Sequence, residues 1–237
     1  MEIQREILLS PPHLAGTELH FIRLALGQSN WTSGGENLEV FEHRLDRFLG
    51  SGYSVGLSSG TAAIHLALII LGVKQDDEVL CQSFTFSASA NPVTYVGAKP
   101  VFIDSEPETW NMCPQSLEEA VVDRMAKGKK PKAIIVVHLY GMPAKMNDIM
   151  AVSEKYGIPV IEDAAEALGS AYKGQKCGTF GEMSVLSFNG NKIITTSGGG
   201  ALVCRNLEQK NKAVFLSTQA RDNAPTTSIP KSATTTG

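Results

Sequence analysis

Short apolar runs alternate with amphipathic segments along most of this chain. The run AIIVV at 133–137 predicts a buried strand, because it is short and rich in β-branched residues. The spacing of Leu38, Phe41 and Leu45 instead predicts one face of a helix. Strands are predicted on these grounds at 53–57, 79–82, 99–104, 133–137, 159–161 and 183–188. Helices are predicted at 18–26, 38–49, 62–71, 115–125 and 147–156, with a further helix that ends near residue 96.

The predicted strands and helices alternate roughly every 25–30 residues, which is the pattern of repeated βαβ units. This order predicts an α/β fold with a mostly parallel sheet and helices on both faces. Ligands of such sheets bind beyond the carboxyl ends of the strands. Polar residues follow several of the predicted strands, so this edge of the sheet is the candidate site.

Composition narrows the class of protein. The chain has 237 residues, of which 19% are charged and 43% hydrophobic, as in ordinary soluble proteins. A net charge of -3 offers no basic footprint for nucleic acid or for a membrane surface. The cysteines do not cluster with one another or with histidine, which predicts reduced thiols and neither a metal site nor a disulfide framework. They are Cys81, Cys113, Cys177 and Cys204. The N-terminus lacks an apolar signal core and no apolar run approaches ~18 residues, so we expect a soluble, cytoplasmic protein without a membrane partner. From the net charge we also expect no nucleic-acid partner.

The stretch from Ile161 to Lys192 carries the strongest candidate chemistry. An apolar run leads into the carboxylate pair Glu162 and Asp163, and a second apolar run ends in a polar turn that contains Lys192. An acid and a lysine at the ends of two buried strands suit pyridoxal phosphate (PLP), which binds covalently to a lysine and pairs its ring nitrogen with a carboxylate. The alternative is an ordinary pair of strands followed by surface charges.

A second candidate is the junction at residues 58–61, Ser-Ser-Gly-Thr, between a predicted strand and an apolar helix. A turn of small residues that opens a helix directs free backbone N–H groups and the positive end of the helix dipole toward one point, which suits a phosphate. The alternative is that Ser59 or Thr61 is an ordinary N-cap.

Taken together, these motifs resemble the DegT/DnrJ/EryC1/StrS family of PLP-dependent sugar-nucleotide aminotransferases. The resemblance extends from about residue 8 to residue 225, with the motifs in the family's order. They are SSGTAAIHLAL (58–68), SFTFSASANPV (83–93), KPVFID (99–104), VVHLYG (136–141), IEDAAEALGSAYKG (161–174), SFNGNK (187–192) and GGGALV (198–203). The resemblance implies the large domain of a fold-type I PLP-dependent transferase.

The resemblance assigns a role to each residue near the cofactor ring. Lys192 is the covalent anchor, and it moves a proton between substrate and cofactor once the substrate has displaced it. Asp163 is the partner of the pyridinium nitrogen, and Glu166 occupies the position near the ring hydroxyl. Phe86 stacks on the ring face; read without the family, it is an ordinary core phenylalanine. The presence of Lys192 separates this chain from the family's dehydratase branch, which has histidine there.

The remaining cofactor contacts implied by the resemblance concern the phosphate. Gly60 and Thr61 match the helix start that holds it, and Ser187 matches a phosphate-binding hydroxyl. By family habit the amino donor is L-glutamate, the acceptor is a nucleotide-linked keto sugar and the enzyme is a homodimer. We expect amination at C4 of a UDP-linked 4-keto-6-deoxy sugar. The alternatives are a catalytically inactive, truncated remnant and a PLP-binding regulatory protein.

The last twelve residues depart from the family. We expect residues 1–225 to form the large domain with its N-terminal arm, and a small C-terminal domain to be missing. Codons for residues 226–237, read one base earlier, can spell HYQHSEIGYNYR, which resembles the family segment H-x-x-x-G-x-N-x-R. We therefore predict that this tail is a frameshift product; a natural tail is the alternative.

Overall fold

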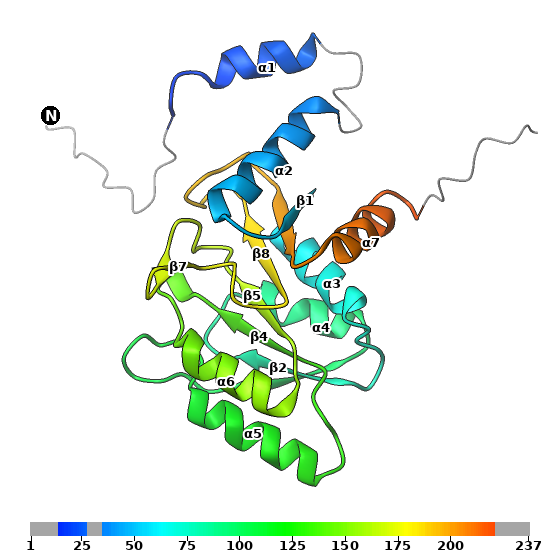
Figure 1. Cartoon of the computed structure of the whole chain (residues 1–237), viewed down its shortest axis with the longest axis vertical. Helices are drawn as coiled ribbons and strands as arrows, with labels where there is room; N and C mark the ends of the chain where they lie inside the picture. The colour runs from blue at the N-terminus through cyan, green and yellow to red at the C-terminus, as the bar shows by residue number, and fades with distance from the viewer. Residues whose placement is uncertain (1–13, 28–34, 221–237) are drawn as a thin grey trace, which may run out of the picture.

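The computed structural model describes residues 14–27 and 35–220, and a seven-stranded sheet lies at its centre (Figure 1). The strands follow the order β1-β9-β8-β5-β4-β2-β3. Their bounds are β1 Tyr53–Leu57, β2 Glu78–Gln82, β3 Lys99–Ile103, β4 Ala133–Val137, β5 Val160–Asp163, β8 Met183–Ser187 and β9 Gly200–Cys204. The predicted boundary at residue 225 and the tail 226–237 lie outside the described residues.

The sheet is mostly parallel, as the sequence predicts. Strand β2 pairs in parallel with β3 and β4, β4 pairs with β5, and β5 pairs with β8. Strand β9 runs antiparallel to both β8 and β1. The carboxyl ends of the other six strands therefore lie at one edge, together with the start of β9. The strand character of β9 and its reversed direction were not predicted.

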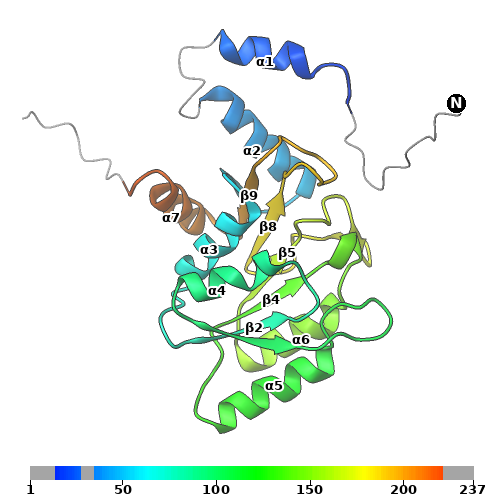
Figure 2. The same ribbon diagram turned by 180° about the vertical axis from the view of Figure 1, so that it is seen from behind.

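Helices cover both faces of the sheet, which confirms the second part of the prediction (Figures 1 and 2). In β4, Ala133 and Ile135 pack into one core cluster with residues of α3, whereas Ile134 and Val136 pack into another with residues of α5 and α6. This follows from strand geometry, since successive side chains point to opposite faces. The helices are α1 Glu18–Leu26, α2 Glu36–Leu49, α3 Gly60–Ile70, α4 Asn91–Tyr95, α5 Pro114–Ala126, α6 Met146–Tyr156 and α7 Leu207–Ser217.

Helix α3 is the most deeply placed helix of the candidate site. It is apolar on nearly all sides, and residues on every turn are buried between the sheet, α4 and α7. The helix begins at Gly60, two residues earlier than predicted, because the Ser59 hydroxyl accepts a hydrogen bond from the Ala62 N–H at 3.0 Å. Ser59 is therefore the N-cap. Thr61 lies inside the first turn.

The remaining elements are short or peripheral. A two-stranded hairpin is formed by β6 (Ala171–Tyr172) and β7 (Gln175–Lys176), and single 3₁₀ turns occur at η1 (Ser87–Ser89) and η2 (Leu139–Gly141). Helix α1 lies apart from the sheet in both views and has no buried residue (Figures 1 and 2). Among the described helices, none combines the length and the apolar character needed to cross a membrane.

Candidate active site

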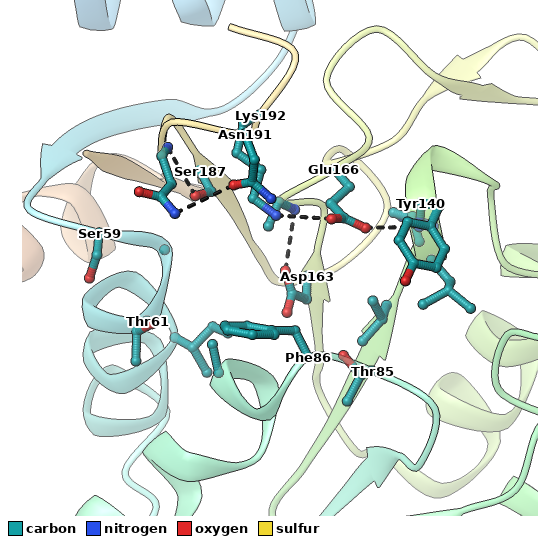
Figure 3. Close-up of a pocket in the computed structure, with 18 of the residues that line it drawn as sticks. Ser59, Thr61, Thr85, Phe86, Tyr140, Asp163, Glu166, Ser187, Asn191 and Lys192 are labelled. Carbon is teal, nitrogen blue, oxygen red and sulfur yellow. Dashed lines mark hydrogen bonds and ion pairs between the residues drawn. The ribbon is translucent and has the colours of Figure 1, made fainter. Parts of the chain in front are cut away.

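One cavity of about 540 Å³ opens at the carboxyl edge of the sheet (Figure 3). Its lining comes from the segments that follow β1, β2, β4, β5 and β8, and from the residues just before β9. All residues that the sequence singles out as cofactor contacts line it. They are Gly60, Thr61, Phe86, Asp163, Glu166, Ser187 and Lys192. The fold thus brings together residues from the range 60–86 and from the range 163–192.

Lys192 lies on the connection from β8 to β9, and its ammonium group points into the cavity toward Glu166 (Figure 3). The Lys192 Nζ lies 3.1 Å from Glu166 Oε1. The other carboxylate oxygen of Glu166 accepts a hydrogen bond from the Tyr140 N–H at 3.0 Å. Tyr140 itself has a left-handed backbone (φ 51°). Glu166 therefore contacts two loops at once: one carboxylate oxygen pairs with Lys192, after β8, and the other accepts from Tyr140, after β4.

Asp163 is the last residue of β5 and is buried at the bottom of the cavity. Its carboxylate accepts hydrogen bonds from the Ser89 hydroxyl at 2.6 Å and from the Ala165 N–H at 3.2 Å. Burial raises the pKa of Asp163 above its ordinary value, because the charged form loses its hydration; the Ser89 and Ala165 donors and the charge of Lys192 oppose the shift. This carboxylate is thus poised to receive a cationic partner.

Glu162, the neighbour of Asp163, points to the other face of the sheet and does not line the cavity. Its carboxylate accepts hydrogen bonds from backbone N–H groups of Gly178, Phe180 and Gly181 at 2.6–2.8 Å. It also accepts one from His138 Nε2 at 3.0 Å. The two acids of the pair therefore differ in role: Glu162 holds loops together, and Asp163 faces the cavity.

The turn between β1 and α3 forms the opposite wall. Gly60 and Thr61 are the first two residues of α3, so their N–H groups lie at the positive end of the helix dipole. Ser187, at the end of β8, lies across from them: a Cβ on Gly60 would be 3.4 Å from the Ser187 Cβ. Helix N–H groups and a hydroxyl around one point form a suitable anion site. The N-cap interpretation holds for Ser59 and not for Thr61.

Phe86 also lies on the cavity wall, and its side chain is largely exposed, at 78%. This exposure rules out the alternative of an ordinary core phenylalanine. Figure 3 shows its ring extending beneath Asp163 toward the α3 side of the cavity. A flat, accessible aromatic face suits stacking on a planar ligand.

Sequence reasoning did not single out Ser89, His138 or Tyr140 as members of the site. Ser89 lies within the family motif SFTFSASANPV, and His138 and Tyr140 lie within VVHLYG, so the motifs contain them without showing what they contact. The Ser89–Asp163 hydrogen bond joins residues 74 positions apart. A local pattern could have identified them only as polar residues after a strand.

A family model, the DegT/DnrJ/EryC1/StrS aminotransferase family, matches residues 14–233 of this chain. The chain belongs to this family. Among the curated members, EpsN of Bacillus subtilis (strain 168), named as a pyridoxal phosphate-dependent aminotransferase, is 53% identical over 223 residues, which is 94% of this chain and 57% of EpsN. The GDP-perosamine synthase of Escherichia coli O157:H7 is 41% identical over 192 residues, 81% of this chain and 51% of that protein.

Solved structures of the DegT/DnrJ/EryC1/StrS family share this fold. Spr1654 from Streptococcus pneumoniae, named as a sugar aminotransferase and solved in its PMP-form, superimposes with a TM-score of 0.81 at 30% identity. The match covers 89% of this chain and 56% of Spr1654. The chain therefore spans only a little over half the length of the family members that it matches.

Proposed function

We propose that this chain contributes the cofactor-binding part of a PLP-dependent aminotransferase that acts on a nucleotide-linked keto sugar. The observation that carries the proposal is the arrangement of Lys192, Asp163 and the N-terminus of α3 around one cavity. A primary amine, a buried carboxylate and an anion site are the groups that PLP needs for its aldehyde, its ring nitrogen and its phosphate. Family membership supports the same cofactor.

The residues fit this cofactor by their chemistry. Bound PLP supplies an electron sink for breaking a bond at the substrate's amino carbon. A cation beside Asp163 compensates the buried negative charge, which the Ser89 and Ala165 donors only partly stabilise. The exposed face of Phe86 offers a stacking surface for a planar ring. The cavity, at about 540 Å³, lies within the usual range for ligand pockets.

Lys192 has two tasks in the proposed reaction. Its amine anchors the cofactor, and after release it accepts and returns the proton that moves during amino transfer. Glu166 holds the ammonium group at 3.1 Å in the described structure. The carboxylate thereby keeps the lysine directed into the cavity. The lysine side chain is only 14% exposed, which limits competition from water.

The finer assignment concerns the substrates. We propose L-glutamate as the amino donor and C4 of a 4-keto-6-deoxy sugar, linked to UDP, as the acceptor, within a homodimer. The names of relatives support a nucleotide-linked sugar, since one is a GDP-perosamine synthase. Because this relative is named for a GDP-linked sugar, GDP-linked and UDP-linked keto sugars are compared as acceptors in the experiment below.

The proposal is tested in steps with the purified chain. Addition of PLP is expected to give the visible absorbance band of a lysine-bound cofactor, and Lys192→Ala is expected to abolish it. Lys132→Ala, which removes an exposed lysine outside the cavity, serves as the control. L-Glutamate is then expected to discharge the band, and a UDP- or GDP-linked 4-keto sugar to restore it. A band that Lys192→Ala retains would contradict the proposal; a band that glutamate leaves unchanged would favour a PLP-binding remnant or regulatory protein.

A further inference from the structure

Asp163 has few partners for a buried carboxylate. Within residues 14–27 and 35–220, its side chain accepts hydrogen bonds from one hydroxyl, that of Ser89, and one backbone N–H, that of Ala165. The shorter of the two, at 2.6 Å, comes from Ser89. Hydrogen bonds to charged groups are stronger than neutral ones, so this contact carries much of the stabilisation of the charged form.

Ser89 is itself buried and has a second partner. The Thr85 and Ser89 hydroxyl oxygens lie 2.7 Å apart. A carboxylate can only accept, so the Ser89 proton goes to Asp163 and the Thr85 hydroxyl donates to Ser89. Thr85, Ser89 and Asp163 thus form a hydrogen-bond network in which each donor polarises the next. Thr85 lies on the cavity wall, and the hydrogen-bond network therefore runs from the wall to the buried Asp163.

The other titratable groups that face Asp163 are occupied elsewhere. Lys192 is paired with Glu166 at 3.1 Å. The His138 ring is held by Glu162 at Nε2 and by the Ala144 N–H at Nδ1. The Cys81 thiol donates to the Gln82 carbonyl, and burial beside Asp163 raises the pKa of this thiol to about 12. None of these contacts replaces the hydroxyl of Ser89.

We infer that Ser89, supported by Thr85, is a positioning residue that keeps Asp163 ionised and fixes the direction of its carboxylate in the cavity. The inference rests on the proposed function, in which Asp163 pairs with the cationic ring nitrogen of PLP. Ser89 does not touch the cofactor in this arrangement. It acts through Asp163, and its contribution depends on the negative charge there.

The first test is a double-mutant cycle on PLP affinity, measured by titrating the full chain. Ser89→Ala is expected to weaken PLP binding about tenfold, the loss of one hydrogen bond to a charged group. Ser89→Thr, which keeps the hydroxyl, is expected to restore affinity. In the Asp163→Asn background, Ser89→Ala is expected to have no further effect. Equal losses in both backgrounds would overturn the inference.

The second test uses the cofactor-free chain and does not depend on PLP binding. The pKa of Asp163 is raised in the folded state, and loss of the Ser89 donor raises it further. The destabilisation caused by Ser89→Ala is therefore expected to grow as pH rises from the raised pKa of Asp163 in the parent to its still higher pKa in the variant, and then to level off. A pH-independent effect would overturn the inference. A chain that binds no PLP contradicts the proposed function, while this measurement still decides the role of Ser89.

Ser153→Ala is the matched control. Ser153 is also buried, and its hydroxyl donates a 2.6 Å hydrogen bond to the Ile158 carbonyl, away from the cavity. Its destabilisation is expected to be the same at every pH and to leave PLP affinity unchanged. If Ser89→Ala does not fold, Thr85→Val removes the second hydroxyl of the hydrogen-bond network with little change of shape. It is expected to show the same dependence on Asp163, with a smaller magnitude, and failure to do so would overturn the inference.

Discussion

A Cβ atom on Gly200 would lie 2.4 Å from the amide nitrogen of Gly60. The first residue of β9 therefore packs directly against the turn that precedes α3. An isolated β-bridge between Ser59 and Gly199 joins the same two segments. Only glycine allows so close an approach of two backbones. The anion site at the start of α3 therefore depends on a glycine that lies far beyond it in the sequence, near the end of the described chain.

Gly200→Ala is expected to destabilise the chain by about 1–3 kcal/mol, because backbone atoms must move to admit the methyl group. Urea denaturation measures the loss, and PLP titration is expected to show weaker binding through the displaced helix start. Gly190→Ala is the control, since a Cβ there meets nothing within 4 Å. Equal stability of the Gly200→Ala chain and the parent would show that β9 does not constrain this turn.

Thr61 and Ser187 are expected to contact ligand, whereas Ser59 stabilises the helix. Thr61→Ala combined with Ser187→Ala should weaken PLP affinity and leave the thermal melting of the cofactor-free chain nearly unchanged. Ser59→Ala removes the N-cap bond to Ala62 and should cost about 1 kcal/mol of stability. If the double variant melts much earlier and binds PLP normally, the two hydroxyls stabilise the fold instead.

Glu162 is expected to be essential for stability. Glu162→Gln replaces one acceptor oxygen by an NH₂ group that faces backbone donors, so at least one of its hydrogen bonds is lost in a buried site. We expect a loss of about 3 kcal/mol in the free energy of unfolding, measured in urea. Glu118→Gln is the control, because Glu118 pairs with Lys155 at the surface and should change little. A Glu162→Gln chain as stable as the parent would contradict this role.

Asp163 gives the cofactor-free chain a predictable pH dependence. Its pKa is higher in the folded than in the unfolded state, so the folded chain binds more protons and its stability falls as pH rises through the interval between the two values. Asp163→Asn removes this pH-dependent loss of stability, because an asparagine side chain does not ionise. The variant should therefore gain stability relative to the parent as pH increases above about 4. With PLP present it should lose amino transfer, because an amide cannot hold the ring nitrogen protonated.

Both parts of that prediction can fail separately. Chemical denaturation at several pH values tests the electrostatic part, and a constant difference between variant and parent would contradict the buried charge. The discharge of the PLP absorbance band by L-glutamate tests the catalytic part. Normal discharge by an Asp163→Asn chain would show that this carboxylate is not the partner of the ring nitrogen.

The sequence alone predicted the class of the fold, and it supplied the hypothesis for the chemistry of the site. Short apolar runs such as 133–137 are buried on both faces, so their strand character can be read without knowing their neighbours. The family motifs around residues 60, 86, 163 and 192 implied seven cofactor contacts, and all seven line the cavity. Local periodicity suffices for the strands because it depends on residues close in the chain. The site residues lie far apart in the sequence, and the resemblance to the family implied them.

Only the tertiary structure decided how these residues are held. The direction of β9, the contact of Gly200 with Gly60 and the bond from Ser89 to Asp163 each join distant segments. Strand pairing depends on the packing of the whole sheet, which no single segment encodes. The different roles of Glu162 and Asp163 likewise depend on which face of β5 meets the cavity. That choice is made when the sheet forms, because alternate side chains of one strand must point to opposite faces.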